Sequence, residues 1–451
     1  MVARRPARGP RHNGDASGAR RRHHRFIRRP LNGAGRARAD RSAGPVVESR
    51  RHIHEQCSAH RPLRPGVLPV TGGHVPVPAR RGLLYAAAAG AAAVFASAPD
   101  ASAAPRPGTS WTASWATAQT APTADDPLAS AGLTDGLCTA RLRLSAGGQV
   151  RLRYAHGFGT APVLVGPVTA DGHPVTFGGR SQEWLAAGAS LTSDPVAGLR
   201  VPDGSLLTVE TRLPGPTGPL SFHRNTHAWH LVDGVRTRSV LLLTGVETTG
   251  ARGPVVAVLG DSIAEGTGTP DDEDLRWPDQ LARRLPGSAV ANLGISGNRL
   301  LLDNDRFGPG AQARFDRDVL SLPGLRTVVV HLGVNDLHHL PVERDAERMV
   351  AAYRQLALRA RSAGLRVVGA TIAPFEGWRR WTPEQDAVRR RVNEVVRTGR
   401  VFDAVADVDA ALRDPDRPSR LLPAFDSGDG LHPGPSGHTA IAAAVERGHL
   451  R

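Results

Sequence analysis

At 451 residues the chain is long enough for two ordinary domains, each with a hydrophobic core of its own. Most of its formal net charge of +15 lies in residues 1–104, which hold 19 of the 57 basic residues and 5 of the 42 acidic ones. The remaining residues are close to neutral, which argues against nucleic acid as a partner, and two cysteines exclude a disulfide framework.

The first 104 residues are interpreted as a leader. Residues 1–79 are rich in arginine and lack apolar periodicity, so we expect a disordered basic segment rather than a nucleic-acid-binding arm. Residues 80–104 resemble a signal peptide, because a twin-arginine-like pair precedes the apolar run 82–98 and an A-x-A cleavage site at Ala101 and Ala103 follows. The run is too short for a membrane anchor, so we expect secretion without stable membrane insertion.

The signal peptide lies unusually far from the first residue. A signal peptide normally begins near the start of translation, so we expect a mis-assigned start and a true one at a valine between Val67 and Val77. Cys57 precedes the signal, so the exported chain would carry Cys138 alone and no intramolecular disulfide. We interpret Cys138 as a small, buried or half-buried residue.

Residues 108–250 carry an apolar pattern of period two, which indicates an antiparallel β-sandwich as an accessory domain. In ARLRLSAGGQVRLRY, leucines and arginines alternate on both sides of Gly147 and Gly148, a pattern that predicts a hairpin. Further strands are expected in LLTVETRL and SVLLLTGVE, which the turn-rich stretch LPGPTGPL and other polar segments separate.

Residues 254–448 alternate short apolar runs with longer amphipathic ones, which predicts a parallel sheet covered by helices on both faces. In such sheets ligands bind at the carboxyl ends of the strands. The expected strands are 255–259, 289–293, 326–331, 366–372 and 401–407. The expected helices are 277–285, 344–363, 383–398 and 435–447.

Polar groups follow several of these strands. The first strand, in VVAVLGDSIAEGTG, ends at Ser262, while NLGISGN provides a glycine-rich loop around Gly297 whose N–H groups can point at a ligand. HLGVND leaves Asn335 just beyond the third strand. In DSGDGLHPGPSGH, Asp429 and His432 are three residues apart, so the carboxylate can hold the imidazole and direct Nε2 at a serine.

In this order, GDSI, ISGN, GVND and DGLHP resemble the four sequence blocks of the SGNH, or GDSL, hydrolase family. The preceding β-domain, with SWTASWATAQTAP, is similar to that of secreted actinobacterial GDSL-type esterases. The resemblance spans residues 254–448 and implies the SGNH hydrolase fold, a flavodoxin-like doubly wound parallel sheet. The absence of a G-x-S-x-G elbow argues against the α/β-hydrolase family.

The resemblance also implies roles for individual residues. Ser262 would be the nucleophile, His432 the general base and then acid, and Asp429 the group that orients the imidazole. The oxyanion hole would comprise the N–H groups of Ser262 and Gly297 and the side-chain amide of Asn335. Acyl transfer requires these roles on chemical grounds as well.

Other polar residues in these motifs are expected to play lesser parts. His338 and His339 lack a carboxylate or cysteine partner at ligand spacing, so we expect solvated side chains and no bound metal. Asp261 and Asp336 are expected to accept hydrogen bonds from loop N–H groups rather than to act in catalysis.

The sequence therefore predicts a secreted, monomeric serine esterase that needs no metal or cofactor and hydrolyses carboxylic esters through an acyl-enzyme. Two substrate classes stay open: short acyl groups such as acetyl on polysaccharides, and lipid or other small esters. Trp378 and Trp381 either line the acyl or sugar pocket or pack in the core. The alternative is a glycan-binding protein in which the second domain is a non-catalytic SGNH scaffold.

Overall fold

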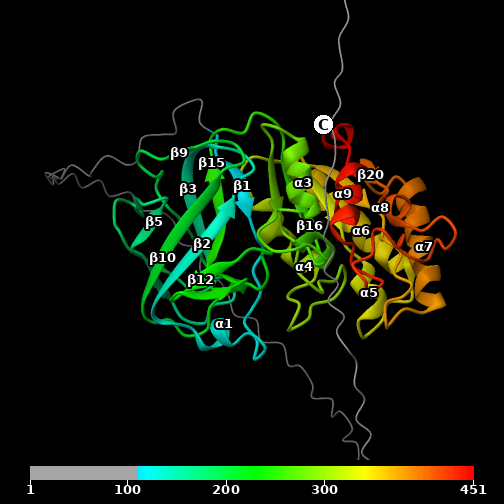
Figure 1. Ribbon diagram of the computed structural model, residues 1–451, viewed down its shortest axis with the longest axis horizontal. Coiled ribbons are helices and arrows are strands. Elements are labelled where there is room, and N and C mark those ends of the chain that lie inside the picture. The colour runs from blue at the N-terminus through cyan, green and yellow to red at the C-terminus, as the bar shows by residue number, and fades with distance from the viewer. Residues whose placement is uncertain (1–109) are drawn as a thin grey trace, which may run out of the picture. The chain divides into compact units, whose positions relative to one another are not determined.

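The computed structural model describes residues 110–451, so the predicted leader and signal peptide lie outside the described residues. An antiparallel region comes first along the chain and a parallel sheet with helices follows it, within one compact unit (Figure 1). Among residues 110–451, no helix has the length and apolar character that crossing a membrane requires.

The antiparallel region is built from two large sheets and two strand pairs. The first sheet comprises β1 (Thr112–Ala116), β15 (Leu243–Thr248), β3 (Gly148–Ala155) and β8 (Ser190–Thr192), with β9 (Arg200–Val201) paired to β3. The second comprises β13 (Val235–Thr237), β12 (His230–Val232), β2 (Thr134–Arg143), β10 (Leu206–Pro216), β5 (Val168–Ala170) and β6 (His173–Val175). The pairs are β4 (Val163–Val165) with β7 (Glu183–Leu185), and β11 (Phe222–His223) with β14 (Val240–Leu241).

The two large sheets share one core, as a sandwich requires. Buried apolar side chains from both sheets form a single cluster, which includes Leu142 of β2 and Leu152 of β3. The hydroxyl groups of Tyr154 and Thr211 lie 2.7 Å apart and connect β3 with β10 inside this core.

The predicted hairpin at Gly147 and Gly148 is wrong. β2 and β3 are not neighbours in one sheet, because the chain crosses from one sheet to the other between them. Leu142 of β2 and Leu152 of β3 both point inward, so the two strands contribute to opposite walls of the core instead of pairing edge to edge. An alternating pattern specifies a half-buried strand but not its partner, and both arrangements satisfy it.

The second region has five parallel strands in the order β17-β16-β18-β19-β20, which is the flavodoxin-like order and confirms the predicted fold class. The strands are β16 (Val255–Gly260), β17 (Ala289–Asn292), β18 (Leu325–His331), β19 (Arg366–Ala370) and β20 (Ala404–Ala406). All six residues of β16 are buried, as the apolar run predicts. β20 is shorter than the predicted strand 401–407.

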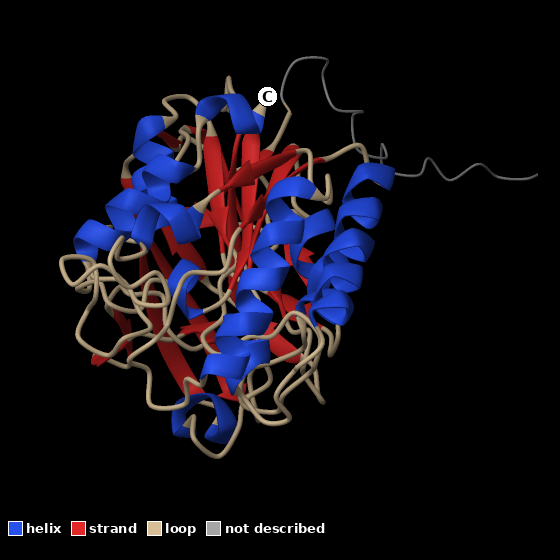
Figure 2. Ribbon diagram, turned by 90° about the vertical axis from the view of Figure 1, so that its right-hand side faces the viewer, coloured by secondary structure: helices blue, strands red, loops and turns tan. Residues whose placement is uncertain are grey.

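Helices flank the strands in Figure 2. The four predicted helices are found as α3 (Trp277–Arg284), α6 (Ala346–Ser362), α7 (Pro383–Thr398) and α9 (Pro435–Ala444). α9 ends three residues early because Val445 is extended, and a 3₁₀ turn, Arg447–Leu450, follows. Short helices that the sequence did not predict are α1 (Pro127–Ala131), α2 (Ser262–Glu265), α4 (Ala311–Phe315), a π turn (Asp316–Leu320), α5 (Val334–His338) and α8 (Val408–Leu412).

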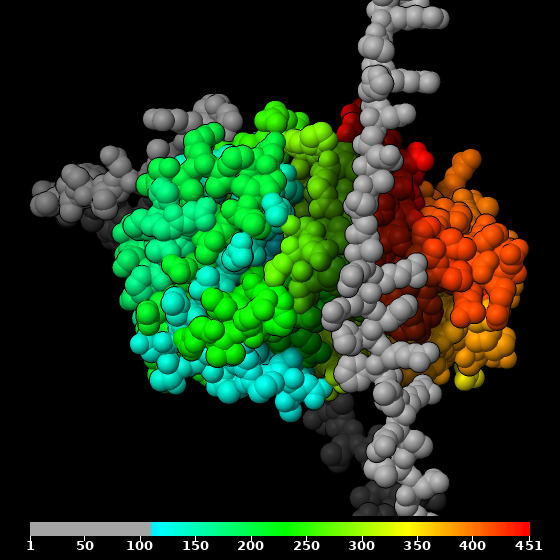
Figure 3. Space-filling view, in the orientation of Figure 1, coloured from blue at the N-terminus to red at the C-terminus, as the bar shows by residue number. Residues whose placement is uncertain are grey.

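The sandwich packs against the open edge of the parallel sheet, where β1 lies beside β17. Ala113 and Ala146 of the sandwich form a small apolar cluster with Val255 and Ala289 of the parallel strands. In the space-filling view the surfaces of the two regions adjoin (Figure 3). The edge strand β17 is therefore covered, which removes an unpaired edge from solvent.

Candidate active site

Ser262 is positioned by the sharp turn at the end of β16. Asp261 caps the short helix α2 by accepting a hydrogen bond from the N–H of Ile263 at 3.0 Å, and Ser262 is the first helical residue. A side chain at Gly260 would place its Cβ 2.2 Å from the Cβ of Ala264, so the turn requires glycine there. As the first residue of a helix, Ser262 has an N–H without an intrahelical partner.

Ser262, His432 and Asp429 form an unbroken hydrogen-bonded series. The Oγ of Ser262 lies 2.9 Å from Nε2 of His432, and Nδ1 of His432 lies 2.7 Å from Oδ2 of Asp429. Because the carboxylate accepts at Nδ1, the imidazole presents its Nε2 lone pair to the serine hydroxyl. The arrangement can thus remove the serine proton and store it on the imidazole.

A turn outside any helix brings Asp429 to His432. The two residues lie in a loop before α9, where Gly430 adopts a left-handed φ of +76°. Oδ1 of Asp429 accepts hydrogen bonds from the N–H groups of Leu431 (2.9 Å) and His432 (2.8 Å). Partial burial raises the pKa of Asp429, but these bonds and the one from the imidazole outweigh it and lower the pKa to about 2.

The predicted oxyanion donors lie on adjacent loops. Gly297 has a left-handed φ of +75°, and a Cβ there would lie 2.4 Å from the ring of Phe307. The buried amide of Asn335 donates one hydrogen bond to the carbonyl of Asn298 at 3.0 Å, which leaves its second N–H for another acceptor. Within residues 110–451, the N–H groups of Ser262 and Gly297 donate to no protein acceptor.

Arg314 connects the loops on which these groups lie, and the sequence analysis missed it. Its buried guanidinium donates to the carbonyls of Gly260 (2.9 Å) and Leu293 (2.8 Å) and to Oδ1 of Asn298 (2.9 Å). Asp318 balances its charge at 3.3 Å. The charged stretch around Arg314 looks like a solvated helix surface, so no local signal identified it.

Glu265 is a second buried group that the sequence did not reveal. Its carboxylate accepts hydrogen bonds from the hydroxyl and the N–H of Ser296, the residue before Gly297. Nε2 of His223, from β11 of the sandwich, lies 3.6 Å from the same carboxylate. Burial raises the pKa of Glu265 to about 7. Glu265, at the end of α2, thus holds the glycine-rich loop, and His223 of the sandwich contacts the same carboxylate.

The hydrogen bonds expected of the two aspartates are confirmed. Asp261 accepts from Ile263, as described above, and Asp336 accepts from the N–H groups of Leu300 (2.7 Å) and Leu301 (3.0 Å). Burial raises the pKa of Asp261 to about 7 and that of Asp336 to about 6. Both carboxylates therefore hold loops rather than face the reacting groups.

The expectation of a solvated side chain is wrong for His338. Helix α5 turns this side chain inward, where it is buried and packs 5.7 Å from the ring of Trp378. Burial lowers the pKa of His338 to about 3. Among residues 110–451, no group of three histidine, cysteine or acidic side chains has the arrangement of a metal site.

Trp378 lies beside the imidazole of His432, with the ring centroids 6.0 Å apart and nearly perpendicular planes. Trp378 and Trp381 are both partly buried against the core of the parallel-sheet region. Cys138 is half-buried and unpaired, as expected, and burial raises its pKa to about 12, which suits a structural thiol rather than a nucleophile.

Residues 258–440 match the GDSL-like Lipase/Acylhydrolase family. Comparison with curated proteins gave no match.

Several solved structures are similar to the chain. A family two carbohydrate esterase from Clostridium thermocellum, in complex with cellohexaose, is 16% identical, with 69% of this chain and 89% of that chain covered and a TM-score of 0.34. A putative acylhydrolase from Bacteroides fragilis is 18% identical, with 44% and 89% covered and a TM-score of 0.35. The native aryl esterase of M. smegmatis is 17% identical, with 43% and 96% covered and a TM-score of 0.35.

Proposed function

We propose that the chain is a secreted serine esterase, because its match to the GDSL-like Lipase/Acylhydrolase family over residues 258–440 identifies it as a carboxylic ester hydrolase of that family. The observation that carries the proposal is the hydrogen-bonded series from Ser262 through His432 to Asp429, at 2.9 and 2.7 Å. These distances lie within the range that proton transfer between a nucleophile and its base requires.

The first half of the reaction forms an acyl-enzyme. Nε2 of His432 takes the proton from Ser262 as Oγ attacks the ester carbonyl, and the carbonyl oxygen becomes negatively charged in the tetrahedral intermediate. His432 then donates the same proton to the alcohol oxygen as the bond to the acyl carbon breaks. Ionised Asp429 stabilises the imidazolium that exists between these two transfers.

The second half of the reaction restores the enzyme. Water replaces the alcohol, His432 removes a proton from it, and the hydroxide attacks the acyl carbon. Collapse of the second intermediate releases the carboxylic acid and returns the proton to Ser262. The N–H groups of Ser262 and Gly297 and the amide of Asn335 are the donors that we propose for the oxyanion in both halves.

The proposed substrates are esters with a short acyl group on a carbohydrate, or lipid and other small esters. In either case Trp378, perpendicular to the imidazole, is the side chain that we propose to face the departing alcohol. Because the nucleophile, the base and the oxyanion donors are all protein groups, we propose that the enzyme needs no metal or cofactor. We also propose that it is a monomer. Turnover should therefore persist in EDTA.

A fluorophosphonate probe tests the proposal, because it labels activated serines and ignores binding sites. Wild type should be labelled and Ser262→Ala should not, and wild type should hydrolyse at least one member of a panel of acetyl, butyryl and longer esters and acetylated xylan. Absence of labelling and of hydrolysis, together with glycan binding, would favour the non-catalytic alternative. Sequencing the amino terminus of protein recovered from the culture medium tests secretion, with cleavage expected after Ala103.

A further inference from the structure

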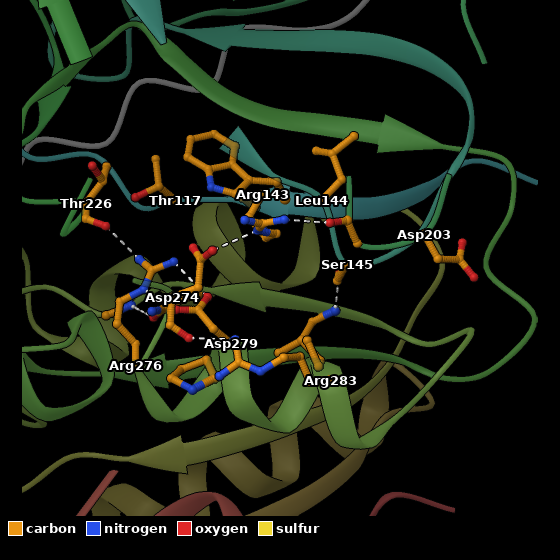
Figure 4. Close-up of a pocket in the computed structure, with 18 of the residues that line it drawn as sticks. Thr117, Arg143, Leu144, Ser145, Asp203, Thr226, Asp274, Arg276, Asp279 and Arg283 are labelled. Atoms are coloured by element: carbon orange, nitrogen blue, oxygen red, sulfur yellow. Dashed lines mark hydrogen bonds and ion pairs between the residues drawn. The ribbon is translucent and has the colours of Figure 1, made fainter. Parts of the chain in front are cut away.

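A cavity of about 560 Å³ lies between the sandwich and the parallel-sheet region. Figure 4 shows Arg143 and Leu144 of the sandwich on one side of it, and Arg276, Asp279 and Arg283, in and before α3, on the other. None of the five residues proposed for catalysis lines it. It is therefore separate from the esterase site.

Two of the three arginines that line this cavity are paired with carboxylates. Arg143 pairs with Asp274 at 2.7 Å, and Arg276 pairs with Asp279 at 2.6 Å. Arg283 donates to the carbonyl of Asp274 at 2.8 Å. Ion pairs of this kind still offer free N–H groups and lone pairs to the hydroxyl groups of a ligand.

Carboxylates and arginines are balanced along the wall when the buried Glu265 is left aside, because Asp203 and Glu273 add to the two paired aspartates and Asp203 pairs with Arg252 at 3.1 Å. His223 is uncharged there, since burial lowers its pKa to about 4. Because the charges balance, neither an anionic nor a cationic ligand gains a net attraction along the wall. The polar part of the wall thus fits a neutral ligand that both donates and accepts hydrogen bonds.

Another part of the wall is apolar, which suits the C–H faces of a sugar ring. The apolar side chains that line the cavity are Trp115, Ala116, Leu144, Pro278, Ala282, Pro286 and Val290. A ligand that combines hydroxyl groups with apolar faces matches both kinds of wall.

A second cavity of about 260 Å³ continues the first. The two have in common the residues Trp115, Arg143, Thr226, Asp274 and Arg276. The Arg143 and Asp274 side chains at this boundary are 42% and 21% exposed, so solvent reaches the pair that divides the two compartments. Two adjoining compartments suit an elongated ligand better than a compact one.

We propose that this two-part cleft binds a segment of a neutral saccharide chain, at a site distinct from the esterase site. The sandwich then supplies half of a carbohydrate-binding surface, and α3 with its preceding loop supplies the other half. The proposal does not depend on the proposed catalysis, because binding can be measured on protein that lacks the nucleophile.

Isothermal titration of full-length Ser262→Ala protein tests the proposal, with linear neutral xylo- and cello-oligosaccharides of three and six units as probes. At least one series should bind, with the hexamer about tenfold tighter than the trimer because only the longer chain spans both compartments. An oligogalacturonate of six units should bind at least tenfold more weakly. Choline serves as a cationic probe. Failure of every neutral probe to bind, or stronger binding of the anionic or the cationic probe, would overturn the proposal.

Substitutions locate the site. Ala282→Trp in the same background fills the larger cavity and should abolish binding, whereas Ala197→Trp, at an exposed position outside both cavities, should leave the affinity unchanged. Arg143→Glu places a second carboxylate beside that of Asp274 without adding bulk to the core. This substitution should weaken binding at least tenfold. Unchanged affinity in Arg143→Glu and in folded Ala282→Trp would place binding elsewhere and refute the inference.

Discussion

Asn335 has a structural hydrogen bond, and we propose that it also has a catalytic one. One of its amide hydrogens ties the loop of Asn298 in place, and the other is free for an oxyanion. The two roles predict different consequences, because a hydrogen bond to the oxyanion strengthens only as negative charge develops. The structural bond is worth about 1 kcal/mol of folding free energy.

Asn335→Ala should therefore lower kcat by about 10²- to 10³-fold, or roughly 3 to 4 kcal/mol, with little change in KM. The protein should stay folded, with a modest decrease in its thermal midpoint. Steady-state kinetics and thermal denaturation, with Ser262→Ala for comparison, provide the measurements. A large decrease in the midpoint combined with near-normal kcat in the folded fraction would mean that Asn335 only supports the loop.

Glu265 permits a second test at this scale. Its carboxylate accepts two hydrogen bonds from Ser296, whereas the amide of glutamine offers one acceptor oxygen and one donor group. Glu265→Gln should displace the glycine-rich loop and lower kcat by about 10- to 10²-fold, because small displacements of positioning groups are costly.

Ser296→Ala removes one of the two bonds to Glu265 and should have a smaller effect in the same direction. Both variants should alter kcat more than KM. If Glu265→Gln left kcat unchanged at a normal thermal midpoint, Glu265 would have no part in positioning the loop.

Among the elements, long or fully buried ones could be predicted and short ones could not. The apolar run that forms β16 is specific enough to predict, whereas α2 and α5 have four and five residues and show no period. Ser262 stands out because it follows an apolar strand, and Asp429 and His432 stand out because a carboxylate and an imidazole are three residues apart just before a predicted helix. Arg314 and Glu265 do not, because tertiary packing alone distinguishes a buried charge from a solvated one.

The junction between β1 and β17 yields a prediction for the elements. The N–H of Val290 in the edge strand β17 donates to Oγ of Ser145 at 3.0 Å. Ser145→Ala leaves this N–H without its partner and should cost about 1 to 3 kcal/mol of folding free energy, measured by denaturant unfolding. Ser130→Ala, at an exposed hydroxyl of α1, is the control and should change the free energy by less than about 0.5 kcal/mol. Equal values for the two variants would show that the contact does not stabilise the junction.

At the scale of the whole molecule, buried histidines make stability depend on pH. Burial lowers the pKa of four of them to about 4, whereas an unfolded histidine titrates near 6.5. These four are His223, His230, His331 and His438. Because the unfolded chain then binds protons that the folded chain does not, their contribution is present above pH 6.5 and is lost as the pH falls toward 4.

Three buried carboxyls act in the opposite direction. Asp261, Glu265 and Asp336 have raised pKa values of about 7, 7 and 6, so their contribution favours the folded state as the pH falls. The histidines outnumber them, so the thermal midpoint should decrease between pH 6.5 and 4.5. His331→Leu should make the decrease shallower, since its Nδ1 has no hydrogen-bond partner within the described chain to lose. A midpoint that is flat or rises over this range would contradict the expectation.

The pairing of β1 with β15 also has a consequence for refolding. Thr112 lies opposite Thr248, so the first strand of the sandwich pairs with a strand that is 136 positions further along the chain. Contacts this distant in sequence raise contact order, and the entropy of closing the loop must be overcome before they stabilise anything. We therefore expect β1 to join late and to exchange its amide hydrogens earlier than β16. Until β1 joins, the edge of β17 is open to other molecules, and dilute conditions should favour recovery of the folded protein.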